Sequence, residues 1–71
     1  MEDKFFNIVS NVLKIKVSEV NWNLDRNNLV TWDSMAHIAL IAELDDEMGI
    51  EIPIEEVPNI NILSDFKKYL L

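Results

Sequence analysis

The sequence predicts a small all-α fold: a four-helix bundle with three longer helices, one short third helix, and a long loop between the first two. The 71 residues are 49% hydrophobic, which is enough apolar material for a single core. One glycine and two prolines leave few sites for tight hairpin turns. Apolar residues recur at the three- and four-residue spacing of helices. We therefore expect residues 1–71 to form one domain.

The first helix is predicted over residues 3–15, because the apolar residues of this segment fall on one helical face. These residues are Phe5, Ile8, Val9, Val12 and Leu13. Acidic residues open the segment and lysines close it, which is the order that the helix dipole favours. Residues 16–32 lack this periodicity and contain many turn-forming residues, so we interpret them as the long loop. Its expected apolar anchors are Val20, Trp22, Leu24, Leu29 and Val30.

The second helix is predicted over residues 34–48, with Asp33 as its N-cap and Gly49 just beyond its last turn. The positions that share its core face are His37, Leu40, Ile41, Leu44 and Met48. We therefore expect His37 to be packed beneath the loop, with a backbone carbonyl as its hydrogen-bond partner.

Two further helices are predicted in the last third of the chain. Pro53 suits the first position of a short helix over residues 53–58, which Pro58 ends. Asn61 can cap a last helix near residues 62–71. The residues that this last helix is expected to bury are Leu63, Phe66, Tyr69 and Leu70.

The formal net charge of −7 is concentrated in one part of the chain. Residues 1–26 hold four acidic and four basic residues, whereas residues 27–66 hold nine acidic residues and no Lys or Arg. A segment with nine uncompensated negative charges repels phosphate backbones, so we expect no nucleic-acid binding. A protein partner with a basic surface is the natural electrostatic complement.

The chain contains no cysteine, so it can form neither a disulfide nor a thiolate metal site, and it has no thiol nucleophile of its own. No apolar run approaches the roughly 20 residues that a membrane helix needs. The first residues also lack the features of a signal peptide. We expect a cytoplasmic monomer that does not insert into membranes.

The face of the second predicted helix that lies opposite its core positions is also apolar. Its residues are Met35, Ile38, Ala39 and Ala42, followed by Asp45 and Asp46. Acidic side chains at the negative end of a helix dipole are unfavourable, by roughly 0.3–1 kcal/mol each at an exposed site. An apolar stripe with such an acidic end is typical of a docking surface. The alternative is that the long loop covers Met35 and Ile38.

Ser34 occupies the first position of the same helix, directly after Asp33. The free backbone N–H groups and the positive end of the helix dipole make this position favourable for a phosphate group. The alternative is that Ser34 only caps the helix.

A run of motifs follows in order along this part of the chain. Asp33-Ser34-Met35 begins an apolar helix, the helix ends in the acidic segment 43–47, and Ile52-Pro53 with further acidic residues opens a short helix. Together these motifs resemble the acyl carrier proteins, whose usual pattern is Asp-Ser-Leu, a helix with an acidic end, and then Ile-Pro. The resemblance covers residues 33–70, and the predicted first helix and long loop agree with it in order and length.

The resemblance implies that Ser34 carries a 4′-phosphopantetheine arm, which a phosphopantetheinyl transferase adds from coenzyme A. The thiol of this arm would hold acyl intermediates as thioesters, and Asp33 would help to present Ser34 to the transferase. The chain would then be a carrier rather than an enzyme, and it would serve acyl-loading and acyl-processing enzymes with basic docking patches. The residues implied to dock these enzymes are Met35, Ile38, Ala42, Asp45, Asp46, Glu51, Glu55 and Glu56.

Other functions remain open at this point. Trp32 stands where the family commonly has a small residue, which looks more like a discrete carrier of a specialised pathway. An aminoacyl or peptidyl carrier uses the same arm, and an unmodified acidic helical interaction module would share the docking face without needing Ser34. A hydrolase triad of Ser34, His37 and Asp33 is disfavoured, because one helix start in a small bundle offers no pocket. The acidic cluster does not match a calcium loop, so no metal site is predicted.

Overall fold

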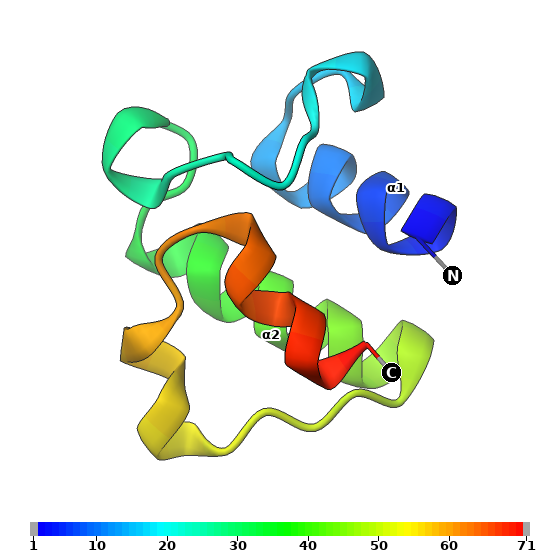
Figure 1. The fold of residues 1–71 in the computed structure, drawn as a ribbon, viewed down its shortest axis with the longest axis vertical. Helices are drawn as coiled ribbons and strands as arrows, with labels where there is room; N and C mark the ends of the chain where they lie inside the picture. Colours follow the sequence, from blue (N-terminus) through cyan, green and yellow to red (C-terminus); the bar gives the residue numbers. More distant parts are fainter. Residues whose placement is uncertain (1, 71) are drawn as a thin grey trace.

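The computed structural model describes residues 2–70, and within them the predicted all-α bundle is confirmed (Figure 1). Two α-helices are joined by a long connection that contains two short 3₁₀ turns, and two 3₁₀-helices follow. In chain order the elements are α1 (Glu2–Leu13), η1 (Val17–Glu19), η2 (Arg26–Asn28), α2 (Ser34–Met48), η3 (Ile54–Asn59) and η4 (Leu63–Tyr69). None of the helices formed by the described residues has the length and apolar character required to span a bilayer.

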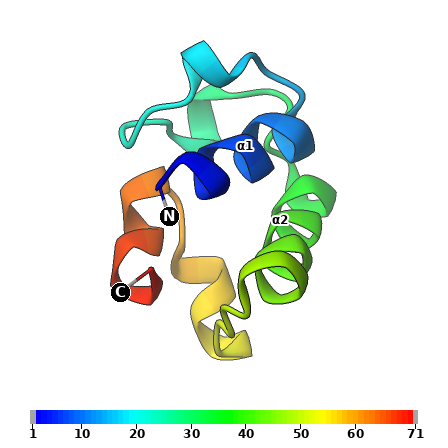
Figure 2. The same ribbon diagram turned by 90° about the vertical axis from the view of Figure 1, so that its right-hand side faces the viewer.

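The helical elements surround one core. Figure 2 shows α2 and η4 on opposite sides of the molecule, with α1 crossing at one end and η3 closing the other. The long connection lies over α1, on the side away from η3. The fully or nearly buried apolar side chains are Phe5, Ile8, Val9, Leu13, Val20, Trp32, Leu40, Leu44, Ile60, Leu63 and Phe66. Because these residues come from both α-helices, the connection and the last third of the chain, the core joins all parts of the domain.

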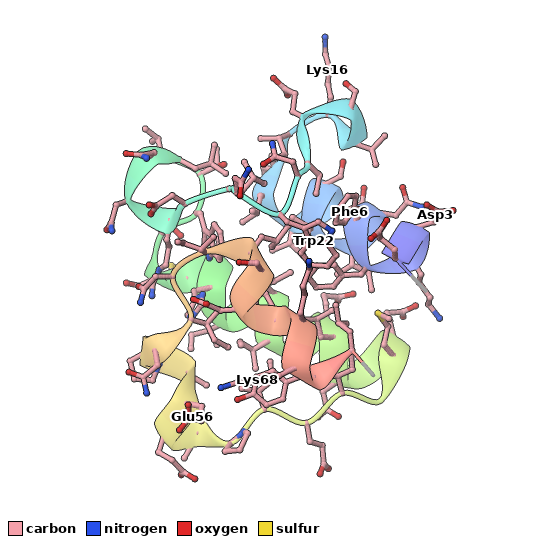
Figure 3. All side chains as sticks on the ribbon, in the orientation of Figure 1. Asp3, Phe6, Lys16, Trp22, Glu56 and Lys68 are labelled. Atoms are coloured by element: carbon pink, nitrogen blue, oxygen red, sulfur yellow. The ribbon has the colours of Figure 1, made fainter. Side chains whose placement is uncertain are left out.

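The long connection is held in place by aromatic packing and by backbone hydrogen bonds. The ring of Trp22 stacks on Phe5, with 5.4 Å between ring centroids, and lies beside Phe6 of α1 (Figure 3). The backbone of the connection also pairs with the start of η4, because Trp22 and Leu24 accept hydrogen bonds from the amides of residues 64 and 63. An isolated antiparallel bridge between residues 25 and 62 extends this pairing.

Four of the five predicted loop anchors are confirmed and one is wrong. Val20 is buried, and Trp22, Leu24 and Leu29 are partly buried against the core. Val30 instead is 93% exposed. The residue that packs inside is its near neighbour Trp32, whose large ring buries much more apolar area than a valine does.

The first predicted helix ends two residues earlier than expected, at Leu13 rather than at residue 15. Lys14 has a φ of 57°, which lies in the left-handed region and cannot continue a right-handed helix. The amide of Ile15 then turns back to the carbonyl of Ser10 at 3.2 Å, the bond that closes a helix after a left-handed residue.

The second predicted helix is confirmed at both ends. The Asp33 carboxylate accepts a hydrogen bond from the Ala36 amide at 2.8 Å, which makes Asp33 the N-cap. Gly49 ends the helix in the left-handed conformation, at a φ of 65°. The predicted core face is also confirmed, since His37, Leu40 and Leu44 are buried while Ile41 and Met48 are partly buried.

The last two helices form near the predicted places, but their ends differ. Pro53 precedes η3 as its N-cap residue instead of opening it, and Pro58 lies inside η3 instead of ending it. A proline there removes a single hydrogen bond, and the amide of Ile60 continues the pattern to Val57.

Asn61 does not cap η4. Instead, the Asp65 carboxylate accepts hydrogen bonds from the amides of Asn61 and Ile62, at 3.0 and 3.2 Å. The buried side chains of η4 are Leu63 and Phe66, with Tyr69 and Leu70 partly buried, as predicted. Residue 71, the end of the predicted helix, lies outside the described residues.

Candidate functional site

Ser34 is exposed at the first position of α2. The extended backbone of Asp33, with φ −88° and ψ −175°, turns the chain into the helix there. Because the Asp33 side chain makes the cap hydrogen bond to the Ala36 amide, the interpretation of Ser34 as the helix cap is wrong. The hydroxyl of Ser34 therefore stands at the surface, next to the positive end of the helix dipole.

A groove of about 380 Å³ lies beside this helix start. Its lining combines Lys14, Thr31 and Asp33 with the apolar residues Val12, Met35, Ala36 and Ala39. Lys14 reaches this place because the chain turns sharply just after α1. The groove therefore places Lys14 alongside Asp33 and Met35, the two sequence neighbours of Ser34.

The outer face of α2 is uncovered. Met35 is 84% exposed and Ile38 is 59% exposed, so the alternative in which the loop covers them is wrong. Two apolar residues outside α2 are also open to solvent: Val30 ahead of the helix, at 93% exposed, and Ile54 at the start of η3, at 84%. No signal in the sequence could have found Val30, because an apolar residue in a loop has the pattern of an anchor. Ile54 follows the Ile52-Pro53 motif and could have been suspected from it.

The acidic residues predicted for docking fall into two groups. Asp45 and Glu51 line a shallow groove of about 460 Å³ between the end of α2 and the segment after it, together with Ala42 and apolar side chains of that segment. Asp46 and Glu55 are exposed as well.

Glu56 differs from the other acidic residues of this surface. Its carboxylate lies 3.9 Å from the Lys68 ammonium of η4, and the side chain is only 39% exposed (Figure 3). The positive charge of Lys68 offsets the negative charge of Glu56. Glu56 therefore contributes less negative potential to the surface than Asp45, Asp46 and Glu51 do.

His37 lies inside the molecule one turn below Ser34, and its side chain is 2% exposed. Its Nε2 atom is 2.8 Å from the carbonyl oxygen of Val57, and its Nδ1 atom accepts a hydrogen bond from the indole N–H of Trp32 at 3.0 Å. The predicted hydrogen bond to a backbone carbonyl is thus confirmed. Burial lowers the pKa of His37 below its ordinary value of 6.5, the hydrogen bond to Val57 opposes this effect, and the positive charge of Arg26 adds to it.

These contacts bear on the hydrolase interpretation. Both ring nitrogens of His37 are engaged with Trp32 and Val57, and the carboxylate of Asp33 is engaged with the amide of Ala36. The base and the orienting acid that a triad requires are therefore held in other hydrogen bonds. Across residues 2–70, no cluster of three or more His, Asp or Glu side chains has the arrangement needed to hold a metal ion.

A comparison with protein-family models found none that matches this chain. The candidate functional residues are consequently chosen by their chemistry and placement. One nucleophilic hydroxyl stands exposed at a helix N-terminus. An uncovered apolar face and an acidic groove lie on the same helix. Such an arrangement can carry a phosphate-linked group and bind a basic partner.

Proposed function

We propose that this protein is a cytoplasmic acyl carrier protein, which holds acyl intermediates as thioesters on a 4′-phosphopantetheine arm attached to Ser34. The observation that carries the proposal is the division of roles at the start of α2. Asp33 caps the helix through the Ala36 amide, which leaves the adjacent Ser34 hydroxyl exposed for modification.

The chemistry of the arm fits this position. A phosphodiester on Ser34 carries negative charge, and the N-terminal amides of α2 and the side chain of Lys14 beside the neighbouring groove offer positive potential. The carrier function requires a thiol, and the chain has no cysteine to compete with the thiol of the arm. The arm, added from coenzyme A, would supply that thiol.

The surface around Ser34 suits the enzymes that such a carrier must meet. Exposed Met35 and Ile38 can enter an apolar pocket of a partner, while Asp45 and Asp46 attract a basic rim. We propose a phosphopantetheinyl transferase and acyl-loading and acyl-processing enzymes with basic patches as these partners. The docking residues are Met35, Ile38, Ala42, Asp45, Asp46, Glu51, Glu55 and Glu56, of which Glu56 is weakened by its ion pair.

The test is modification in vitro. The purified chain is incubated with coenzyme A and a phosphopantetheinyl transferase of broad specificity, and its intact mass is measured. The expected result is the gain of one phosphopantetheine group, which Ser34→Ala abolishes. Ser18→Ala is the matched control, because Ser18 is also exposed but lies in η1, and this variant should be modified fully.

The outcomes separate the candidate functions. No mass gain, or a gain that persists in Ser34→Ala, contradicts the carrier proposal and leaves an unmodified acidic interaction module. If the arm is added, the loaded cargo distinguishes an acyl carrier from an aminoacyl or peptidyl carrier. Mass spectrometry of the chain isolated from its native cell, before and after thioester cleavage by hydroxylamine, identifies that cargo.

A further inference from the structure

Three segments that are far apart in the sequence meet at one buried ring. Trp32 belongs to the connection before α2, His37 to the first turns of α2, and Val57 to η3. The indole N–H of Trp32 donates to His37 Nδ1 at 3.0 Å, and His37 Nε2 lies 2.8 Å from the Val57 carbonyl oxygen. We call this arrangement the Trp32–His37–Val57 bridge. It is the side-chain link that ties the Ser34 end of α2 to η3.

The partners determine the protonation state of the ring. An indole N–H is only a donor, so His37 Nδ1 must be the acceptor and carries no proton. A carbonyl oxygen is only an acceptor, so the proton lies on Nε2 and points to Val57. The bridge is therefore complete only when His37 is neutral and in the Nε2–H tautomer. A second proton on Nδ1 would face the indole N–H donor to donor, and the bond to Trp32 would be lost.

The surroundings of the ring supply no negative charge to compensate that proton. From η2, Arg26 contributes a positive charge that opposes protonation. On α2, the Asp33 carboxylate is turned to the Ala36 amide and is exposed. On η3, Glu56 is paired with Lys68 and Glu55 is exposed. From the connection, the Trp32 ring is neutral.

We propose that the Trp32–His37–Val57 bridge is a pH-sensitive link that positions the start of α2, and that protonation of His37 releases Trp32 while the hydrogen bond to Val57 is kept. His37 is thus a positioning residue for the segment that bears Ser34. The proposal concerns the unmodified chain and does not depend on the attachment of any group to Ser34.

The direction of the pH effect follows from the lowered pKa of His37. Above about pH 6.5 the ring is neutral in both the folded and the unfolded chain, and the stabilisation by the bridge is fully present. As the pH falls from 6.5 towards the folded-state pKa, the unfolded chain binds the proton more readily, and this stabilisation is lost. Over that interval His37 raises the unfolding equilibrium constant by at most about tenfold per pH unit.

Nuclear magnetic resonance tests the proposal directly, because His37 is the single histidine of the chain. In ¹⁵N-labelled protein above pH 7, the ring should show a protonated Nε2 and an unprotonated Nδ1. On acidification, the ring should titrate with a midpoint below 6.5, and the indole N–H signal of Trp32 should shift with the same midpoint. The indole of Trp22, which donates to the Glu2 carboxylate at the surface, serves as the internal control. A protonated Nδ1, a midpoint at or above 6.5, or a Trp32 signal that ignores this midpoint would overturn the proposal.

Two variants separate the pH-sensitive link from a merely structural role. His37→Gln keeps one donor and one acceptor but cannot titrate, so its unfolding free energy should lose the slope that the unsubstituted protein shows just below pH 6.5. Trp32→Phe removes the donor to Nδ1, so the titration midpoint of His37 should rise towards 6.5. An unchanged slope in the first variant or an unchanged midpoint in the second contradicts the proposal. Should either variant fail to fold, the titration of the unsubstituted chain decides alone.

Discussion

Asp33 and Ser34 are adjacent residues with different environments. The Asp33 carboxylate accepts a hydrogen bond from the Ala36 amide at 2.8 Å and so satisfies one of the free N–H groups of α2. Ser34 is exposed and lies within the helix itself. One turn further on, the side chain of His37 is buried and bonded at both nitrogens. The three residues of the disfavoured triad thus belong to a cap, a surface and a core.

The division between Asp33 and Ser34 can be measured by thermal unfolding. Asp33→Ala should lower the unfolding free energy by about 1 kcal/mol, because it removes the cap hydrogen bond. In a domain of this size that corresponds to a decrease of about 4–8 °C in Tm. Asp33→Asn keeps a cap oxygen and should recover most of the loss. Ser34→Ala should change Tm little, and a loss equal to that of Asp33→Ala would mean that Ser34 contributes to capping.

The two α-helices end in the same backbone conformation but with different residues. Lys14 and Gly49 both have φ near 60°, in the left-handed region. Glycine adopts this conformation without a steric penalty, whereas a side chain costs about 1–2 kcal/mol. The sequence signal is therefore strong at the end of α2 and missing at the end of α1, which is why only the latter was predicted two residues too late.

Substitutions at these two helix ends should have opposite effects on stability. Lys14→Gly should raise the unfolding free energy by up to about 1 kcal/mol, since it relieves the left-handed conformation. Gly49→Ala should lower it by about 1 kcal/mol, and the added Cβ meets no atom within 4 Å, so the loss is conformational rather than steric. Denaturant unfolding measures both changes. Equal signs for the two variants would refute the explanation.

The acidic end of α2 is the second feature at the scale of the element. Asp45 and Asp46 are exposed at the negative end of the helix dipole, where they reduce helix stability. A surface that lowers the stability of its own helix is understandable if it binds a basic partner. Asp45 also lines the groove beside Glu51, so the negative charge continues from α2 to the next segment.

Replacing both Asp45 and Asp46 by Lys should therefore raise Tm and slow partner binding. Association with a phosphopantetheinyl transferase, followed by stopped-flow fluorescence at low salt, should slow by at least about tenfold. The difference should shrink as salt is added, because screening weakens both the attraction of the unsubstituted protein and the repulsion of the Lys variant. Glu19→Gln, an acidic-to-neutral change in η1, is the control and should leave the rate nearly unchanged. An unaffected rate in the Lys variant would place the docking surface elsewhere.

Across the whole molecule, charge is distributed unevenly. Residues 27–66 hold nine acidic residues without Lys or Arg, and Glu56 with Lys68 forms an ion pair among the described residues. The basic residues gather at the two ends of the chain, and Lys67 of η4 lies over the Trp22 ring, 4.8 Å from its centroid. Within residues 2–70 no other ion pair involves the acidic residues of α2 and η3, so their mutual repulsion is not offset locally.

This repulsion predicts a salt-dependent stability. Raising the ionic strength from about 0.01 to 0.15 M shortens the screening length from about 30 to 8 Å, so Tm should increase. Divalent cations should have the same effect at lower concentration without a specific site. Thermal unfolding monitored by circular dichroism at pH 7.5 measures this, since His37 is neutral there and does not contribute. A constant Tm over this range would show that the acidic residues lie too far apart to interact.

The sequence by itself determined the helices, the Asp33 cap, the Gly49 end and the core face of α2. Each is a local property, set by spacing along the chain and by the hydrogen bonds and dihedral angles of neighbouring residues. The exposed stripe of Met35 and Ile38 followed from the same spacing, although only the structure excluded a covering loop.

Tertiary structure decided which residues of the connection lie inside. Val30 and Trp32 are both apolar and near each other in sequence, but Trp32 is buried and Val30 is not. Besides its larger apolar area, Trp32 finds a hydrogen-bond acceptor in His37, whose other ring nitrogen pairs with the Val57 carbonyl twenty residues further along the chain. No local pattern records a contact between three separate segments, because it arises only when the core brings them together. The predicted place of Ser34 is a consequence of sequence, and the bridge that holds its helix is a consequence of folding.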